Sequence, residues 1–265
     1  MNFDISHLLE SWDYQPGQLA VRRLKGKDGQ DRVQMRLDLG ILQMHADGRP
    51  DGKRPMGHVS LYEFFQDRLE KYKLENDDNE EGFVLKPADI SRLQQEAIQY
   101  HHRYICFFQL GDYDSVLRDA ERNLKMFDFV DDYAENDDLS WSLQQFRPQL
   151  LMMLTRAEGS LAVDEEDWTQ ATEVIKEGIE ALKEFYSDFG KPELMDHSGE
   201  IQSLEQWLEE LESSSKDGIG EKPEKAIKKL TKVEKLEIDL QEAIVREDYE
   251  KAAKVRDIIN KLKSP

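Results

Sequence analysis

Residues 109–116 read QLGDYDSV, and this stretch decides the class of fold. Gly111-Asp112 forms an acidic turn, Tyr113 enters the first turn of the following helix, and Val116 stands three positions later. The carboxylate stabilises the N-terminus of that helix, whose backbone dipole is positive there. The aromatic ring can pack back on the preceding helix, and a small or β-branched residue three positions on permits close approach. The stretch therefore predicts a helical hairpin.

The same pattern recurs at Glu166-Asp167-Trp168 and at Glu247-Asp248-Tyr249. Around the first two copies, apolar residues recur at three- and four-residue spacing, which is typical of amphipathic helices. This spacing predicts helices over residues 88–110, 114–129, 140–162, 168–186 and 201–211. We therefore expect a mainly α fold, with an acidic helical domain over residues 87–212.

The first two copies resemble tetratricopeptide repeats, in which a similar turn joins two helices. Tyr100 and Phe107 stand where that motif has large residues, and Gly159 and Ala171 match small positions. Tyr113 and Trp168 are 55 residues apart, which departs from units of about 34 residues. An unrelated helical bundle that uses a common turn is the alternative.

The sequence pattern of residues 1–75 predicts a small α+β unit with a β-hairpin. We expect a short helix over residues 5–12 with Asp4 as its cap, and a strand over residues 18–24. Residues 32–44 alternate between apolar and polar, with Val33, Met35, Leu37 and Leu39 on one face, as in a half-buried strand. Gly40 would be a bulge in that strand.

A helix follows this hairpin in the predicted N-terminal unit. Ser60 and Glu63 form a capping-box pattern at its start. Because a lone hairpin is marginally stable in water, we expect this helix to cover the hairpin's apolar face.

Two segments allow two interpretations each. The loop over residues 45–58 is rich in glycine and proline and carries Arg49, Lys53 and Arg54, so it is either a binding loop or a plain connection. Residues 141–154 are more apolar than a one-sided helix needs, so they form core or a methionine-lined peptide groove.

Residues 213–224 are rich in serine and glycine and predict a flexible linker. Two further helices are expected over residues 225–246 and 249–263. Within them, Ala243, Glu247-Asp248-Tyr249-Glu250, Ala252-Ala253, Arg256-Asp257, Ile259 and Leu262 resemble the UVR motif of UvrB and UvrC, which also occurs in McsA-type adaptors and Clp ATPases.

The resemblance implies that residues 225–265 form a two-helix hairpin that mediates protein–protein contact. The partner would be a protein of the repair or Clp-type machinery, or a second copy of the chain. Docking onto the acidic domain of the same chain is the alternative. The predicted partner-binding residues are Leu240, Ala243, Ile244, Tyr249, Ala252, Ala253, Arg256, Ile259 and Leu262.

The charge distribution narrows the choice of partner. The chain has 265 residues and a net charge of -20. Residues 1–58 hold nine basic and eight acidic residues, and residues 221–265 hold twelve and ten, which leaves -23 for residues 59–220. This charge argues against general nucleic-acid binding, because such binding depends on neutralising phosphates.

The sequence also gives an expectation about the cellular compartment of the protein. The sequence predicts no membrane span and no secretory signal at its start. The single cysteine, Cys106, fits a reducing cytoplasm.

The chemistry-bearing residues predict no catalytic site, metal or cofactor. There is no glycine-rich phosphate loop with a lysine. His101-His102 lack the spacing of a helical metal site, Cys106 is expected to be buried, and the acidic runs near Asp77 and Asp131 lack the pattern of a calcium loop. An enzyme that uses His45, His58 and Asp51 is the weakest hypothesis, because these residues show no base–nucleophile pairing.

The predicted function is that of a non-enzymatic, cytoplasmic adaptor that docks a partner through its C-terminal hairpin. The alternative is an accessory factor of nucleotide excision repair that contacts DNA or the repair complex.

Overall fold

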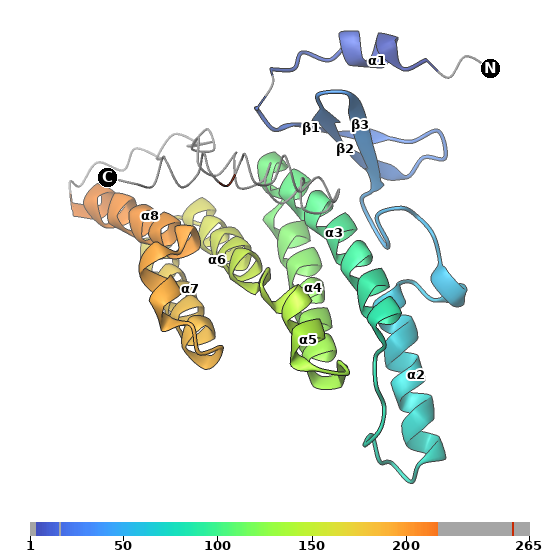
Figure 1. The fold of residues 1–265 in the computed structure, drawn as a ribbon. Coiled ribbons are helices and arrows are strands. Elements are labelled where there is room, and N and C mark those ends of the chain that lie inside the picture. The colour runs from blue at the N-terminus through green and yellow to red at the C-terminus, as the bar shows by residue number, and fades with distance from the viewer. Residues whose placement is uncertain (1–3, 16, 217–255, 257–265) are drawn as a thin grey trace. The chain divides into compact units, whose positions relative to one another are not determined.

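The computed structural model describes residues 4–15, 17–216 and 256 (Figure 1). Within the described residues, the chain divides into two units, one of residues 21–35 and 42–216 and one that includes residues 4–15, 17–20 and 36–41. The described part is mainly helical and has a small antiparallel sheet near its N-terminus, as predicted. The helices are α1 (Ser6–Glu10), α2 (Leu61–Glu75), α3 (Pro87–Leu110), α4 (Tyr113–Tyr133), α5 (Asp137–Gln144), α6 (Arg147–Asp164), α7 (Trp168–Asp188) and α8 (Gly199–Lys216).

The sheet has three strands in the order β1 (Ala20–Lys25), β2 (Asp31–Leu37) and β3 (Gly40–His45). The prediction of one bulged strand over residues 32–44 is wrong, because the chain turns at Asp38 and Leu39 and Gly40 begins β3. Leu39, expected on the apolar face, lies in the turn and is 92% exposed. Alternation alone cannot distinguish one long strand from two strands joined by so short a turn.

The central strand β2 is buried on both faces. Val33 and Met35 are buried as predicted, but Arg32, Gln34 and Arg36 on the opposite face are buried too. The side chain of Arg32 pairs with Asp28, and Gln34 accepts a hydrogen bond from Arg22 and donates one to Gln43. Hydrogen bonding of this kind offsets the cost of burying polar groups.

The short helix α1 begins at Ser6, one residue later than predicted, so its N-cap is not the predicted Asp4. Ile5 occupies the N-cap position, while the Asp4 carboxylate accepts hydrogen bonds from the backbone N–H and the hydroxyl of Ser6. These hydrogen bonds lower the pKa of Asp4.

Helix α2 begins after the predicted N-cap, Ser60, but it does not pack where we expected. The Ser60 side chain accepts a hydrogen bond from the Glu63 backbone N–H, which confirms the N-cap. The helix packs against α3 and the 3-10 turn Pro55–Gly57, so the expectation that it covers the hairpin is wrong. Glu96 of α3 explains this position, because its carboxylate accepts hydrogen bonds from the backbone N–H groups of Leu61 and Tyr62.

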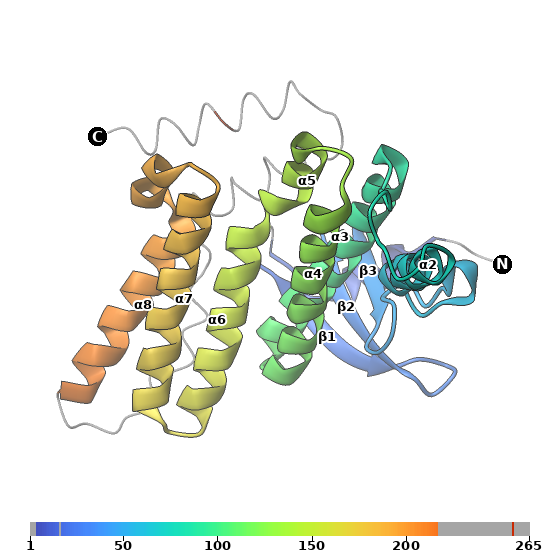
Figure 2. The ribbon, with the colours of Figure 1, turned by 90° about the horizontal axis from the view of Figure 1, so that it is seen from below.

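The acidic turns at Gly111-Asp112 and Glu166-Asp167 each join two helices of a hairpin. Helix α3 packs on α4, α4 on α6, α6 on α7 and α7 on α8 (Figure 2). Gly111 adopts the left-handed conformation, with φ of 72°, that glycine tolerates at a helix C-terminus. Asp112 and Asp167 are the N-caps of α4 and α7, and the Tyr113 ring packs against Phe108 of the preceding helix. The hairpins predicted at the first two copies are confirmed, the third copy lies outside the described residues, and the resemblance to tetratricopeptide repeats stays a prediction.

Several predicted helix boundaries change. The expected helix over residues 140–162 is two helices, α5 and α6, with a break at residues 145–146. Pro148 accounts for the break, since proline is tolerated in the first turn of a helix but not in its interior. Helix α8 extends to Lys216 and so includes the first four residues of the predicted linker, while residues 217–224 lie outside the described residues.

The apolar segment over residues 141–154 belongs to the core. Leu143, Leu150 and Leu154 are buried, and Leu151 and Met152 pack against the buried cluster formed by α6, α7 and α8. This confirms the core interpretation over the methionine-lined groove.

Close contact between α6 and α7 depends on Gly178. A Cβ atom at Gly178 would lie 2.1 Å from Oγ1 of Thr155 and 2.4 Å from its Cγ2. We expect Gly178→Ala to lower the free energy of unfolding by ~1–3 kcal/mol, although alanine favours helix by ~1 kcal/mol. Urea denaturation measures the loss.

Gly199→Ala is the control for this prediction, because nothing lies within 4 Å of a Cβ atom at Gly199. Adding Thr155→Ala to Gly178→Ala should restore part of the lost stability. Equal stabilities for Gly178→Ala and Gly199→Ala would contradict the prediction.

Candidate functional site

The predicted partner-binding residues lie almost entirely outside the described part of the chain. Leu240, Ala243, Ile244, Tyr249, Ala252, Ala253, Ile259 and Leu262 are not described. Arg256 is described, and it is helical and exposed. The hairpin geometry inferred for residues 225–265 therefore stays a prediction.

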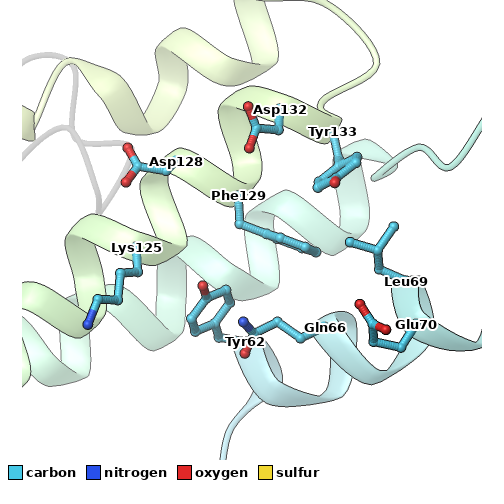
Figure 3. Close-up of a pocket in the computed structure, with 9 residues that line it drawn as sticks. All are labelled: Tyr62, Gln66, Leu69, Glu70, Lys125, Asp128, Phe129, Asp132 and Tyr133. Atoms are coloured by element: carbon cyan, nitrogen blue, oxygen red, sulfur yellow. The ribbon is translucent and has the colours of Figure 1, made fainter. Parts of the chain in front are cut away.

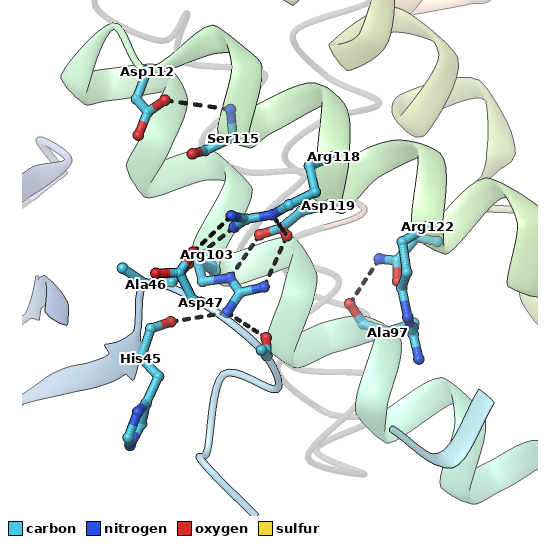
Figure 4. Close-up of polar contacts among 12 residues, drawn as sticks. His45, Ala46, Asp47, Ala97, Arg103, Asp112, Ser115, Arg118, Asp119 and Arg122 are labelled. Atoms are coloured by element: carbon cyan, nitrogen blue, oxygen red, sulfur yellow. Dashed lines mark hydrogen bonds and ion pairs between the residues drawn. The ribbon is translucent and has the colours of Figure 1, made fainter. Parts of the chain in front are cut away.

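The glycine- and proline-rich loop is anchored by a buried ion pair. The guanidinium of Arg103 donates to both carboxylate oxygens of Asp119, at 2.6 and 2.8 Å, and each side chain is 1% exposed (Figure 4). Its third nitrogen donates to the backbone carbonyls of His45 and Gly48, at 2.9 and 2.7 Å. One buried cation thus joins α3, α4 and the start of the loop.

Arg118 of α4 adds a second link to the same loop. Its guanidinium donates to the backbone carbonyl of Ala46 at 2.9 Å and pairs with Asp47 and Asp119 (Figure 4). These contacts hold residues 45–48 on the helices.

A second buried carboxylate holds the far end of the loop. Glu96 is fully buried and pairs with Arg49, 3.0 Å away, and with Arg122 of α4. The same carboxylate caps the N-terminus of α2 through Leu61 and Tyr62, where an anion is favourable. Arg49, considered above as a binding residue, therefore has a structural role. For this part of the loop, the structure favours the interpretation as a connection between strand and helix over that of a binding loop. Lys53 and Arg54 are exposed.

The three residues of the enzyme hypothesis have separate surroundings. His58 packs edge-on against Phe64 and lies 3.6 Å from Asp67. Asp51 lies 3.5 Å from Arg49, and the His45 ring lies beside Gly52. No contact between His58 and either of the other two is present in the described structure.

Cys106 is buried, as predicted. Its thiol is fully shielded from solvent, and burial raises the pKa of this group to about 12. The reactive thiolate is therefore scarce at neutral pH.

His101 is held in its neutral form. Its Nδ1 lies 2.7 Å from the Tyr104 hydroxyl, and burial, with a smaller contribution from His102, lowers the pKa of His101 to about 3. In the unfolded chain this group takes up a proton near pH 6.5. Between these two values the unfolded state binds the extra proton, so stability falls as the pH falls.

We expect His101→Gln to reduce the loss of stability between pH 6.5 and 3, because glutamine does not titrate. Urea denaturation at several pH values measures this slope. His7→Gln is a control on exposed α1. Identical slopes for His101→Gln and the unmodified protein would contradict the prediction.

A groove separates α2 from α4. Its volume is about 340 Å³. Figure 3 shows residues that line it. Phe129 lies at its floor and Tyr62 and Tyr133 beside it, while Glu70 stands on the α2 side and Asp128 and Asp132 stand on the α4 side. The sequence prediction missed this site, because residues 62–70 and 125–133 meet only in the folded chain.

The described residues contain neither a metal-binding cluster nor a helix that could cross a membrane. Over residues 4–15, 17–216 and 256, no group of three or more histidine, cysteine or acidic residues could hold a metal ion. No helix in that same part of the chain has the length and apolar character needed to cross a membrane.

Comparison with known proteins finds one family. Residues 231–264 match the family model of the UvrB/uvrC motif, or UVR. The match coincides with the predicted C-terminal hairpin and shows that the chain carries this motif at its C-terminal end. Neither the curated proteins nor the solved structures contain a significant match to the chain.

Proposed function

We propose that this protein is a non-enzymatic adaptor that docks a partner protein through its C-terminal UVR motif. The observation that carries the proposal is the family match over residues 231–264. The UVR motif is a protein-interaction module in repair and Clp-type proteins. We accordingly propose a partner from one of these two systems, or a second copy of the chain, and a cytoplasmic location.

The residues of the motif support this proposal. Leu240, Ala243 and Ile244 form an apolar stripe on the first predicted helix, and Ile259 and Leu262 continue one on the second. A two-helix segment of this size buries too little surface to be stable alone. A complementary surface, most simply in a four-helix arrangement, would cover these stripes.

A second candidate function is direct DNA contact in nucleotide excision repair. It is favoured by the lysine-rich stretch of residues 222–235, which holds six lysines against two glutamates. A mobility-shift titration at low salt tests it. A shift that disappears when these lysines are replaced by glutamine would support DNA contact, and no shift would exclude it.

The adaptor proposal is tested by comparing the intact chain with residues 1–216. Both are used to capture proteins from a lysate, and the captured protein is then purified and its binding measured. We expect at least one captured protein to bind the intact chain and not residues 1–216, with the circular dichroism expected of α1–α8 retained. Equal binding to both chains would contradict the proposal.

A further inference from the structure

The groove between α2 and α4 has an aromatic floor that is already assembled. Phe129 is buried and packs against Tyr62 at 5.6 Å and Tyr133 at 4.9 Å between ring centroids. Phe83 also packs against Phe129 and Tyr133, at 6.4 and 5.3 Å between ring centroids. Tyr62 and Tyr133 are themselves partly exposed, and the Arg122 guanidinium already lies over the Tyr62 ring, 5.5 Å from its centroid.

Carboxylates flank this floor on both sides. Glu70 projects from α2, and Asp128 and Asp132 project from α4 (Figure 3). Lys125 is the basic residue in the lining, and it lies 3.6 Å from Glu121 outside the groove. Asp128 pairs with Arg147, whereas no ion pair of Glu70 or Asp132 is present in the described part of the chain.

Electrostatic crowding is concentrated at Asp132. Burial, and after it the neighbouring carboxylates of Asp131, Asp128 and Glu80, raise the pKa of Asp132. A cation bound beside Asp132 would relieve this repulsion.

We propose that the groove between α2 and α4 binds a lysine- or arginine-bearing amphipathic segment of a partner protein. An apolar side chain of that segment would lie against Tyr62, Phe129 and Tyr133, and flanking cations would pair with Glu70 and Asp132. A cation over a tyrosine ring gains further attraction from the ring's π-electrons. The volume of about 340 Å³ is at the lower end of the ~300–1,000 Å³ range of ligand pockets, which suits a few side chains of a peptide.

The negative charge of the groove favours a basic segment over a nucleic acid or an acidic peptide. A nucleic acid or an acidic peptide would be repelled by carboxylates on both walls. The groove lies outside residues 231–264, so the inference stands independently of the UVR-based proposal.

The test uses the full chain and two fluorescent peptides. One is a short amphipathic peptide of lysine and leucine, and the other has glutamate in place of every lysine. Anisotropy titrations at low and high salt give the affinities. We expect the lysine peptide to bind, the glutamate peptide not to bind, and binding to weaken at high salt.

Charge reversal locates the site. Glu70→Lys with Asp132→Lys should weaken binding of the lysine peptide by at least about tenfold. Glu173→Lys with Glu184→Lys on α7 is the matched control, because both glutamates are exposed and the change in net charge is the same. Circular dichroism verifies that both variants are folded.

Three outcomes would overturn the proposal. They are no binding of the lysine peptide at low salt, equal binding of the glutamate peptide, and equal weakening by the two double variants. The last outcome would mean that the peptide responds only to the overall negative charge of the chain.

Discussion

Asp119→Ala is expected to lower the free energy of unfolding by about 3–5 kcal/mol. The substitution leaves the Arg103 guanidinium buried without its counter-charge, because Asp119 accepts two hydrogen bonds from it and both side chains are 1% exposed. The backbone carbonyls of His45 and Gly48 would remain as partners of Arg103, but they carry no full charge. Urea denaturation followed by circular dichroism measures the loss.

Two further variants test whether the loss in the free energy of unfolding comes from burial of the Arg103–Asp119 pair. Glu180→Ala removes the exposed pair with Lys183 and should cost no more than about 0.5 kcal/mol. Replacing both Arg103 and Asp119 with apolar residues of similar volume should cost less than Asp119→Ala alone. A loss for Asp119→Ala no larger than that of Glu180→Ala would show that the pair is not buried as described.

Glu96→Ala is the second substitution for which we expect a large effect, of about 3 kcal/mol or more. It removes one buried carboxylate that pairs with two arginines, Arg49 and Arg122, and caps α2. The loop over residues 45–58 should then become sensitive to limited proteolysis, because the pair of Glu96 with Arg49 and its cap on α2 are both lost.

Glu135→Ala is the control for Glu96→Ala, since it removes only an exposed ion pair with Lys86. Cleavage sites located by mass spectrometry identify the loop that opens. A Glu96→Ala protein whose loop resists cleavage as well as that of Glu135→Ala would refute the assigned role.

The helical hairpins could be predicted because their signals are local. Gly111 and Asp112 act within a few residues of their own position, and so does Asp167 at the start of α7. The division between α5 and α6 was also readable in principle, because Pro148 marks the first turn of a helix. The position of α2 was not, since it depends on Glu96, which follows α2 by more than twenty residues.

The buried ion pairs could not be predicted from sequence for the same reason. Arg103 and Asp119 read as ordinary polar positions on two amphipathic helices, and only the folded chain brings them together. The groove has a similar origin, because residues 128–133 read simply as part of an acidic helix until Tyr62 and Glu70 of α2 are placed beside them. The UVR motif, in contrast, is one continuous sequence pattern and was recognisable at once.

A single titration decides whether the UVR motif carries the binding of a partner protein. The purified partner is titrated by calorimetry into the intact chain and into the Ile244→Asp variant, with Lys254→Asp as a control that places the same residue outside the predicted binding set. We expect Ile244→Asp to weaken binding by at least about 100-fold, because it puts a charge in an apolar interface, and Lys254→Asp to have an effect of less than about tenfold. Equal affinity for the Ile244→Asp variant and the intact chain would show that the UVR motif does not carry the binding.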